Sequence, residues 1–400
     1  MNPSLTWLDL TTGDRDAMRR VLDLFSEQGT VDELGLGSLR DAVADGLFPG
    51  TSTIQTRLAY MLFIPWIYLR LEEKGVSAGE IVAKARKREI ALIKPLTEGE
   101  DLEGIIGIRA RASLSRLPSS VYWAGLVRWG IFLHPKSQGW YHVHFDRLRD
   151  GRGGAGRADD PGVVWTRQPN WNPRIPSPPQ GFPWEASFLL RRGDADFLLG
   201  RILESCHGTL LAYLADAGKS DFARSFWDDP SIATAPPELR RQVEFARRFS
   251  LHVEGAPLLY NLLLAERTYE HFGRNEERVA EYRELLEDWG AREAQEAPFQ
   301  PAELWSVVAR SGARSPTRQR RFVETWTRLL AEAHPRRAAD APNLCRLIEA
   351  REAGLKGPRA RLRNPERLSS WKGASGVGRM DFRWHRVRVL LSDLQRGLDA

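Results

Sequence analysis

The stretch ELRRQVEFARRFSLHVEGAPLLYNLLLAERTYEHF, residues 238–272, decides the fold class, because its apolar side chains recur at helical spacing. It predicts two helices, Glu238–Leu251 and Ala256–Phe272. No strand-like run follows Trp184, and the rest of this half predicts more helices. They are Asp194–Gly218, Asp221–Trp227, Glu276–Ala294, Pro301–Arg310, Arg318–His334, Asn343–Ala353 and Asp381–Leu398. A mainly α, multi-helical fold is therefore expected.

The N-terminal half adds further helices and one mixed element. Helices are expected over Ser38–Leu47, Arg57–Glu73 (with a kink or break at Pro65) and Ser77–Ile93. The stretch Glu100–Arg147 then predicts a helix over Leu102–Ala112, a turn, a helix over Val121–Trp129 and an alternating strand over Trp140–Phe145. This order is typical of a winged helix, a small α+β element, although two helices packed beside a small sheet would give the same pattern.

Composition divides the chain into three expected parts. Residues 1–150 form an N-terminal helical domain with the winged-helix-like element, and residues 184–400 form a C-terminal helical domain with a basic tail segment. Between them, residues 151–183 are rich in Gly and Pro and contain Trp165 and Trp171. Such a segment forms neither a regular helix nor a central strand, so we expect a linker or an ordered strap.

The net charge of +6 conceals an uneven distribution. Residues 310–400 contain 21 Lys and Arg against 9 Asp and Glu, a net charge of +12, so the remaining residues carry −6. Only two cysteines are present, Cys206 and Cys345, which excludes a disulfide framework. The first residues resemble no secretory signal, and the longest apolar run, Tyr60–Leu69, is too short to cross a bilayer. Secreted, collagenous and membrane-spanning classes are excluded, and a cytoplasmic location is expected.

Two segments supply candidate residues for binding nucleic-acid phosphates. In the basic tail, the glycine-rich turn between Lys372 and Arg379 could direct backbone amides at an anion. The helix Ser119–Trp129 could act as a recognition helix. The alternatives are that the arginines pair with the acidic N-terminal part and that Trp123 and Trp129 belong to the core. The candidates are Arg361, Arg363, Lys372, Arg379, Arg383 and Arg386 in the tail, and Ser119, Tyr122 and Arg128 in the helix.

A metal site is a weaker candidate. On the expected strand, His142, His144 and Asp146 would share one face and could bind a transition metal. The alternative is a hairpin whose polar face carries these residues while Tyr141, Val143 and Phe145 face the core. Gly218-Lys219-Ser220 lacks the spacing of a phosphate loop, and no other cofactor motif is present, so no cofactor is expected.

Four blocks resemble one family of uncharacterised bacterial proteins of about this length. They are TWLDLTTGDRDAMRRVLDLFSEQGTVDELGLGSLRDAVADGLFPGTSTIQTRLAYMLFIPWIY, SSVYWAGLVRWGIFL, RRFSLHVEGAPLLYNLLLAE and WKGASGVGRMDFRWHRVRVLL. The resemblance covers nearly the whole chain. It implies gene clusters for anti-phage defence or DNA processing, beside helicases and nucleases, and it implies no catalytic residues.

The expected function is that of a non-catalytic accessory subunit that binds nucleic acid through the basic tail. Its expected partners are nucleic acid and a helicase or nuclease of the same system, without a membrane. A scaffold that docks such an enzyme without touching DNA is one alternative, and a metal-dependent hydrolase that uses His142, His144 and Asp146 is another.

Overall fold

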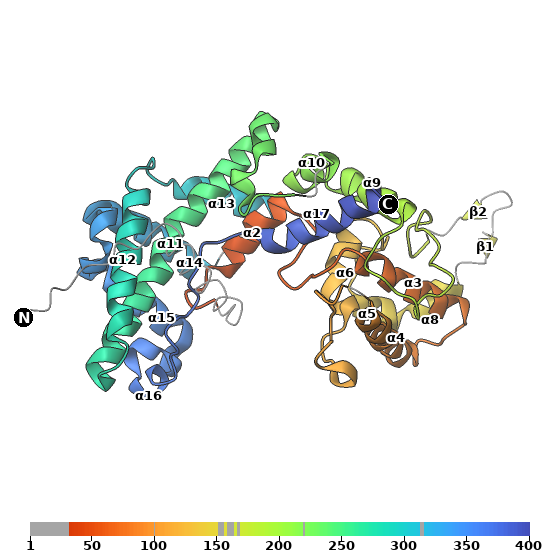
Figure 1. The fold of residues 1–400 in the computed structure, drawn as a ribbon, viewed down its shortest axis with the longest axis horizontal. Helices are drawn as coiled ribbons and strands as arrows, with labels where there is room; N and C mark the ends of the chain where they lie inside the picture. The colour runs from red at the N-terminus through yellow and green to blue at the C-terminus, as the bar shows by residue number, and fades with distance from the viewer. Residues whose placement is uncertain are drawn as a thin grey trace, which may run out of the picture. The chain divides into compact units, whose positions relative to one another are not determined.

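The computed structural model describes residues 32–99, 101–150, 156–157, 164–165, 169–218, 221–312 and 316–400, and it is mainly α-helical, as expected (Figure 1). Contacts along the chain group the residues into two compact units. Unit 1 comprises Met1–Val43 and Glu244–Phe382, and unit 2 comprises Ala44–Val243 and Arg383–Ala400. The division into residues 1–150, 151–183 and 184–400 stays a prediction, since compact contact units and independently folding domains are different properties.

Unit 1 is built around α11, the long green helix of Figure 1, whose residues from Glu244 onward belong to this unit. The first residues of α2 (Gly37–Leu47) also belong to it. The elements of this unit are α11 (Pro237–Phe272), α12 (Glu276–Glu293), α13 (Pro301–Arg310), α14 (Thr317–Ala333), α15 (Pro342–Lys356), α16 (Pro365–Leu368), and the 3-10 helices η4 (Pro335–Asp340), η5 (Gly357–Arg359) and η6 (Arg361–Arg363).

The expected break between Leu251 and Ala256 is wrong, because α11 runs through it as one helix of 36 residues that includes Pro257. A proline inside a helix removes one backbone hydrogen bond and costs about 3 kcal/mol. Burial on both sides of Pro257 offsets that cost, since Val253, Ala256 and Leu259 are all core residues. Position 255 requires glycine, because a Cβ there would collide with the ring of Trp289 in α12.

Unit 2 contains shorter helices around the apolar helix α3, and α17, the last helix, lies against α9 and α10 (Figure 1). Its elements are α3 (Tyr60–Glu73), α4 (Ile81–Ala91), α5 (Ile93–Glu98), α6 (Pro118–Arg128), α7 (Gln138–Val143), α8 (Phe145–Asp150), α9 (Arg192–Ser205), α10 (Leu210–Asp216), α17 (Trp384–Leu398), the 3-10 helices η1 (Arg111–Ser113), η2 (Phe226–Asp228) and η3 (Pro230–Thr234), and the short antiparallel strands β1 (Gly156–Arg157) and β2 (Val164–Trp165).

Helix α3 forms the centre of this unit, because nearly all of its side chains are buried. Pro65 lies inside α3 without ending it. The described end of the Gly/Pro-rich segment packs on this core: Trp171 is fully buried and its backbone pairs with Phe132. Phe182 is also buried and contacts the ring of Trp66. These described residues of the segment therefore pack against the core of unit 2, and the assignment of residues 151–183 as a linker or strap stays a prediction.

The structure does not support the winged-helix element. The expected strand over Trp140–Phe145 is wrong, since these residues lie on α7 and α8, and Ser137 caps α7 by accepting a hydrogen bond from the amide of Trp140. Tyr141 and Phe145 fit the core because residues four apart share a helix face. Val143 lies between them in sequence and is 76% exposed, which an alternating strand would not allow.

The expected helix over Leu102–Ala112 is also wrong, since the only helical turn that the structure describes there is η1. Gly104 and Gly107 adopt φ angles of +81° and +90°, which belong to the left-handed region and interrupt an α-helix. The second expected helix of the element is confirmed as α6.

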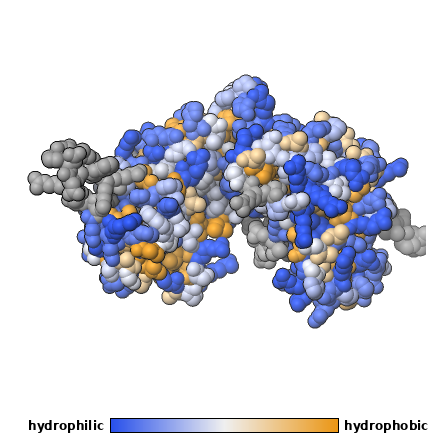
Figure 2. All heavy atoms as spheres, turned by 180° about the vertical axis from the view of Figure 1, so that it is seen from behind, coloured by the Kyte–Doolittle hydropathy of each residue, from blue (hydrophilic) through white to orange (hydrophobic). Residues whose placement is uncertain are grey.

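The surface seen in Figure 2 is dominated by hydrophilic residues, with hydrophobic residues in small groups between them. Among the residues that the structure describes, no helix combines the length and the apolar character that a membrane span requires.

Candidate nucleic-acid interface

The tail candidates divide between the two units. Arg361, Arg363, Lys372 and Arg379 belong to unit 1, whereas Arg383 and Arg386 belong to unit 2. Arg363 and Lys372 are exposed to solvent, and no ion pair joins either of them to another described residue. The other four donate hydrogen bonds within their own units.

Two of these arginines pair with acidic residues from the start of the chain. In unit 1, Arg361 Nη1 lies 2.9 Å from Oε1 of the buried Glu33, which also pairs with Lys356. In unit 2, Arg383 is only 7% exposed and donates to Oδ1 of Asp45 at 2.6 Å and to the Thr51 carbonyl at 2.8 Å. The acidic residues of the N-terminal part thus compensate part of the basic tail inside each unit.

The remaining two tail arginines contact backbone carbonyls. Arg379 Nη2 lies 3.1 Å from the carbonyl of Arg247 in unit 1. Arg386 is half-buried, and its Nε lies 3.3 Å from the carbonyl of Thr53 in unit 2.

The glycine-rich turn faces the protein rather than a ligand. Asn261, fully buried on α11, accepts a hydrogen bond from the Ser375 amide and donates to the Ser375 carbonyl, both at 2.8 Å. Tyr282 donates to the Gly373 carbonyl at 2.7 Å, and Arg361 donates to the Ser375 hydroxyl. The Ser375 amide, which an anion would need, is therefore already satisfied by a side chain of the core.

The candidate recognition residues of α6 are also largely internal. Ser119 and Tyr122 are fully buried, and only Arg128 is exposed, where it donates to the Ser205 carbonyl. Tyr122 donates to the Arg57 carbonyl at 2.8 Å and so connects the segment before α3 to α6. Trp123 and Trp129 are core residues, as the alternative expected.

A buried carboxylate accepts hydrogen bonds from the first turn of α6. Glu89 on α4 accepts hydrogen bonds from the amide and the hydroxyl of Ser119 at 2.7 and 2.8 Å. Burial raises the pKa of Glu89 to about 7, and the two bonds from Ser119 offset only part of that rise. From Ser119, polar contacts continue through Gln138 and Tyr68 to Nε2 of His142.

The metal candidates do not converge. His142 contacts the Tyr68 hydroxyl, His144 Nδ1 lies 2.8 Å from the Trp140 carbonyl, and Asp146 accepts from the Ala78 amide. The strand that would have aligned them is replaced by two helices. Within the described residues, no group of three or more His, Cys, Asp and Glu side chains is placed to bind a metal.

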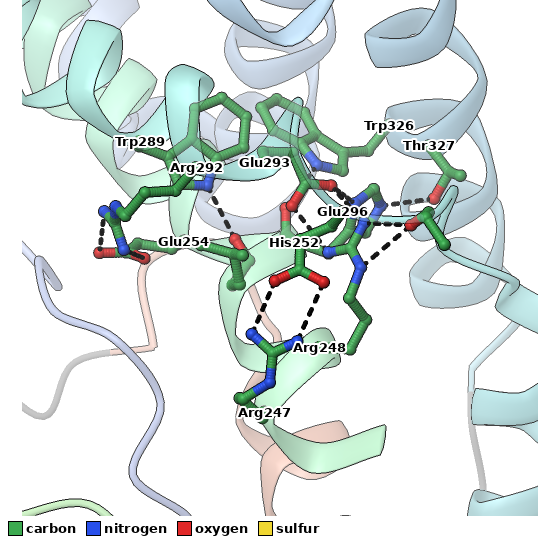
Figure 3. A network of polar contacts seen from close by, with 12 residues as sticks. Arg247, Arg248, His252, Glu254, Trp289, Arg292, Glu293, Glu296, Trp326 and Thr327 are labelled. Atoms are coloured by element: carbon green, nitrogen blue, oxygen red, sulfur yellow. Dashed lines mark hydrogen bonds and ion pairs between the residues drawn. The ribbon is translucent and has the colours of Figure 1, made fainter. Parts of the chain in front are cut away.

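A second polar network lies between α11, α12 and α14 of unit 1 (Figure 3). His252 lies 2.7 Å from Glu293 through Nδ1 and 2.8 Å from the Thr327 hydroxyl through Nε2. Arg248 forms two hydrogen bonds with Glu293, and Arg247 forms two with Glu296.

The order hydroxyl, imidazole, carboxylate in this network is that of a nucleophilic triad. However, His252 and Glu293 are almost fully buried, and the Thr327 hydroxyl also contacts the Val323 carbonyl of its own helix. The network therefore fixes three helices against each other. Sequence reasoning missed it because the partners of His252 lie 41 and 75 residues away.

A group of cations with few carboxylate partners among the described residues lies on α4 of unit 2. Ile81, Ala85 and Glu89 form the buried stripe of this helix. Lysines and arginines occupy much of the rest of its surface, and Lys94 follows on α5. Two of these cations pair with exposed carboxylates, Lys84 with Glu80 and Lys94 with Glu98.

The loop 107–116 lies along the same helix and adds three exposed arginines. Arg86 holds this loop by donating to the carbonyls of Leu114 and Ala112 at 2.7 and 3.0 Å. At the other end, Gly107 packs so closely that a Cβ there would lie 3.0 Å from Ile93 Cδ1. We call the resulting surface the α4 basic face, which comprises Lys84, Lys87, Arg88, Lys94, Arg109, Arg111 and Arg116.

Most cations of the α4 basic face lack a carboxylate partner. No ion pair joins Lys87, Arg88, Arg109, Arg111 or Arg116 to any residue that the structure describes. The sequence alone did not point to this surface, because residues 95–106 separate α4 from the loop arginines. The four cations within KARKR, residues 84–88, were the available signal.

Comparison with known proteins gives a family and no activity. Residues 2–397 match the model of a family of unknown function (DUF6361). No curated protein and no solved structure matches the chain.

Proposed function

The chain belongs to this DUF6361 family of unknown function, and we propose that it binds nucleic acid as a non-catalytic accessory subunit of a bacterial defence or DNA-processing system. The resemblance stated above supports the setting and the partnership with a helicase or nuclease. The α4 basic face supports the binding, and it replaces the basic tail as the proposed main contact.

The observation that carries the proposal is the set of uncompensated charges on the α4 basic face. Phosphate groups of a nucleic acid recur regularly, and each one that a lysine or arginine neutralises releases condensed counterions. The two ion pairs on the face involve exposed side chains, which stabilise the fold little and can exchange for phosphate contacts. A surface of this kind suits the backbone of DNA or RNA without base-specific contacts.

The exposed tail residues Arg363 and Lys372 are a second proposed contact, located in unit 1. Their smaller number predicts a weaker contribution to the salt dependence of binding than that of the α4 basic face.

The test is the salt dependence of binding to labelled single-stranded and double-stranded DNA and RNA, measured by fluorescence anisotropy from about 50 to about 200 mM salt. A variant with Lys87, Arg88, Arg109, Arg111 and Arg116 changed to Gln should bind more weakly. Its plot of log K against log salt should flatten by about 0.9 for each duplex phosphate contact removed. Arg86 stays unchanged because it holds the loop.

A matched control changes five exposed arginines of unit 1 to Gln, namely Arg318, Arg321, Arg336, Arg337 and Arg346. It removes the same charge from the chain but should keep most of the salt dependence. If both variants lost the same amount of affinity and salt dependence, net charge alone would explain the binding, and the α4 basic face would not be the site. Undetectable binding at low salt would favour the scaffold that docks a partner enzyme without touching DNA.

A further inference from the structure

We propose that a cavity of unit 2, between α17 and the loop 101–104, binds a nucleoside that carries a single terminal phosphate. The cavity has a volume of about 310 Å³, which is within the range of small-molecule sites. The site is separate from the α4 basic face, and its test does not depend on the proposed function.

Four arginines line this cavity: Arg57 before α3, and Arg386, Arg388 and Arg396 on α17. Two of them are neutralised within the protein. Arg57 is buried and bonds to Asp393 through Nε and Nη2 and to Asp101 through Nη1. Arg396 donates to the same Asp393 at 3.1 Å. These contacts form a rigid inner wall.

The other two arginines retain their charge. Arg386 is half-buried, and its Nε lies 3.3 Å from the Thr53 carbonyl, which positions the side chain without neutralising it. Arg388 is exposed. No ion pair links either guanidinium to a carboxylate of the described residues, although both line the cavity. Each of these guanidinium groups can donate to phosphate oxygens, and both line the same cavity.

Two carboxylates that also line the cavity limit the charge that it accepts. Glu103 and Asp221 line it, and neither forms an ion pair with a residue that the structure describes. Their negative charges would repel a second or third phosphate, whereas carboxylate oxygens accept hydrogen bonds from neutral hydroxyl groups. A sugar with free hydroxyls and one phosphate suits both the arginines and the carboxylates, and a triphosphate does not.

The cavity also contains an aromatic ring, that of Phe222. Phe222 lines the cavity and is half-buried, with its ring packed edge-on against Trp384 at 5.7 Å. Because Phe222 lines the cavity, a base bound there would contact its ring, and base–aromatic contacts contribute about 1–3 kcal/mol for a nucleic-acid base. This feature favours a nucleoside phosphate over a sugar phosphate.

Isothermal titration of the full chain with AMP, GMP, CMP, UMP, ATP, adenosine and ribose 5-phosphate tests the proposal. We expect saturable binding of at least one monophosphate, weaker binding of ATP and ribose 5-phosphate, and none of adenosine. Arg388→Gln should weaken the monophosphate at least about tenfold, as expected for loss of a charged hydrogen bond. Phe222→Leu should weaken the monophosphate but leave ribose 5-phosphate unchanged.

Arg337→Gln, an exposed arginine of unit 1, is the control and should bind as the unchanged chain does. An oligonucleotide with a 5′-phosphate, compared with its 5′-hydroxyl form, distinguishes a strand end from a free nucleotide as the source of the phosphate. Binding of either source that Arg388→Gln abolishes supports the site. Tighter binding of ATP than of AMP, or absence of saturable binding with every monophosphate and with the 5′-phosphorylated strand, overturns it.

Discussion

Two buried glutamates of this chain experience opposite surroundings. Burial dominates at Glu89 and raises its pKa to about 7, because the hydrogen bonds from Ser119 and the charge of Arg86 offset it only in part. Burial also opposes ionisation of Glu293, but hydrogen bonds from His252 and Arg248 outweigh it and lower the pKa of that carboxyl. Glu89 therefore ionises only around neutral pH, whereas Glu293 stays ionised there.

We predict that Glu89→Gln stabilises the protein above neutral pH. Because the pKa of Glu89 is higher in the folded state, the folded chain binds the proton more tightly, and stability falls as pH rises from about 4.5 to about 7. The neutral variant should not show that decline. Its free energy of unfolding should exceed that of the unchanged chain by about 1–3 kcal/mol at pH 8 and differ little from it below pH 5. Urea unfolding at several pH values checks this.

Glu98→Gln is the control for this measurement, since Glu98 is exposed and follows on α5. It should leave the pH dependence between pH 5 and pH 8 as it is. A Glu89→Gln variant that lost stability equally at pH 5 and pH 8 would mean that packing at Ser119 matters more than the charge.

Glu293→Gln should destabilise unit 1 by about 3–5 kcal/mol, because it leaves the guanidinium of Arg248 without its buried partner. Thermal and urea unfolding measure the loss. The matched change Glu332→Gln removes an exposed ion pair with Arg328 on α14 and should cost less than about 1 kcal/mol. Similar losses from both changes would show that the network of Figure 3 contributes no more than a surface pair.

At the scale of single residues, the sequence identified the candidates by type but not by exposure. Ser119 and Tyr122 suit a DNA-reading helix by composition, yet both are buried. Arg383 and Asp45 lie 338 residues apart, so no local sequence pattern predicts that they pair. Burial and pairing depend on long-range contacts, and these were the properties that the sequence could not provide.

Among the elements, the contact between α11 and α12 depends on one glycine. Replacing a helical glycine with alanine normally stabilises a helix by about 0.5–1 kcal/mol. Gly255→Ala should instead destabilise unit 1 by about 1–3 kcal/mol, because its Cβ would collide with Trp289. Gly354→Ala on α15 meets no neighbouring atom and should stabilise by the normal amount. Chemical denaturation of the two variants should move the midpoint in opposite directions.

Element types were predicted well where the helices are long and their apolar faces are regular. Pro301–Arg310 is confirmed with the same bounds, and α12, α14 and α15 deviate by a residue or a few. The pattern Tyr141-x-Val143-x-Phe145 misled because apolar residues at alternate positions also contain an i, i+4 pair. A short segment cannot distinguish these periods, and the capping residue Ser137 was the signal that could have done so.

At the scale of the whole molecule, unit 2 is completed by the last helix. Helix α17 buries Val387, Leu390, Leu391 and Leu394, and its Asp393 pairs with Arg57 in the core. Deletion of residues 384–400 should therefore unfold unit 2, because it exposes this apolar surface and leaves Arg57 without its main partner.

Hydrogen exchange followed by mass spectrometry checks this prediction residue by residue. The deletion should remove protection from α3 and α6, whereas deletion of only the exposed residues 399–400 should leave it intact. If the amides of α3 stayed protected from exchange in the longer deletion, unit 2 would fold without α17, and the prediction would be wrong.

The pair Arg57–Asp393 also imposes an order on folding during synthesis. These two residues are separated by 336 positions, and the Glu244–Phe382 part of unit 1 is translated between them. A ribosome that has finished residues 44–243 has produced a unit in which Arg57 has Asp101 but still lacks Asp393, its buried partner. Unit 2 must therefore remain exposed to chaperones and proteases until the final helix emerges, so a stalled or truncated message should yield a protein that the cell clears rather than a partly active one.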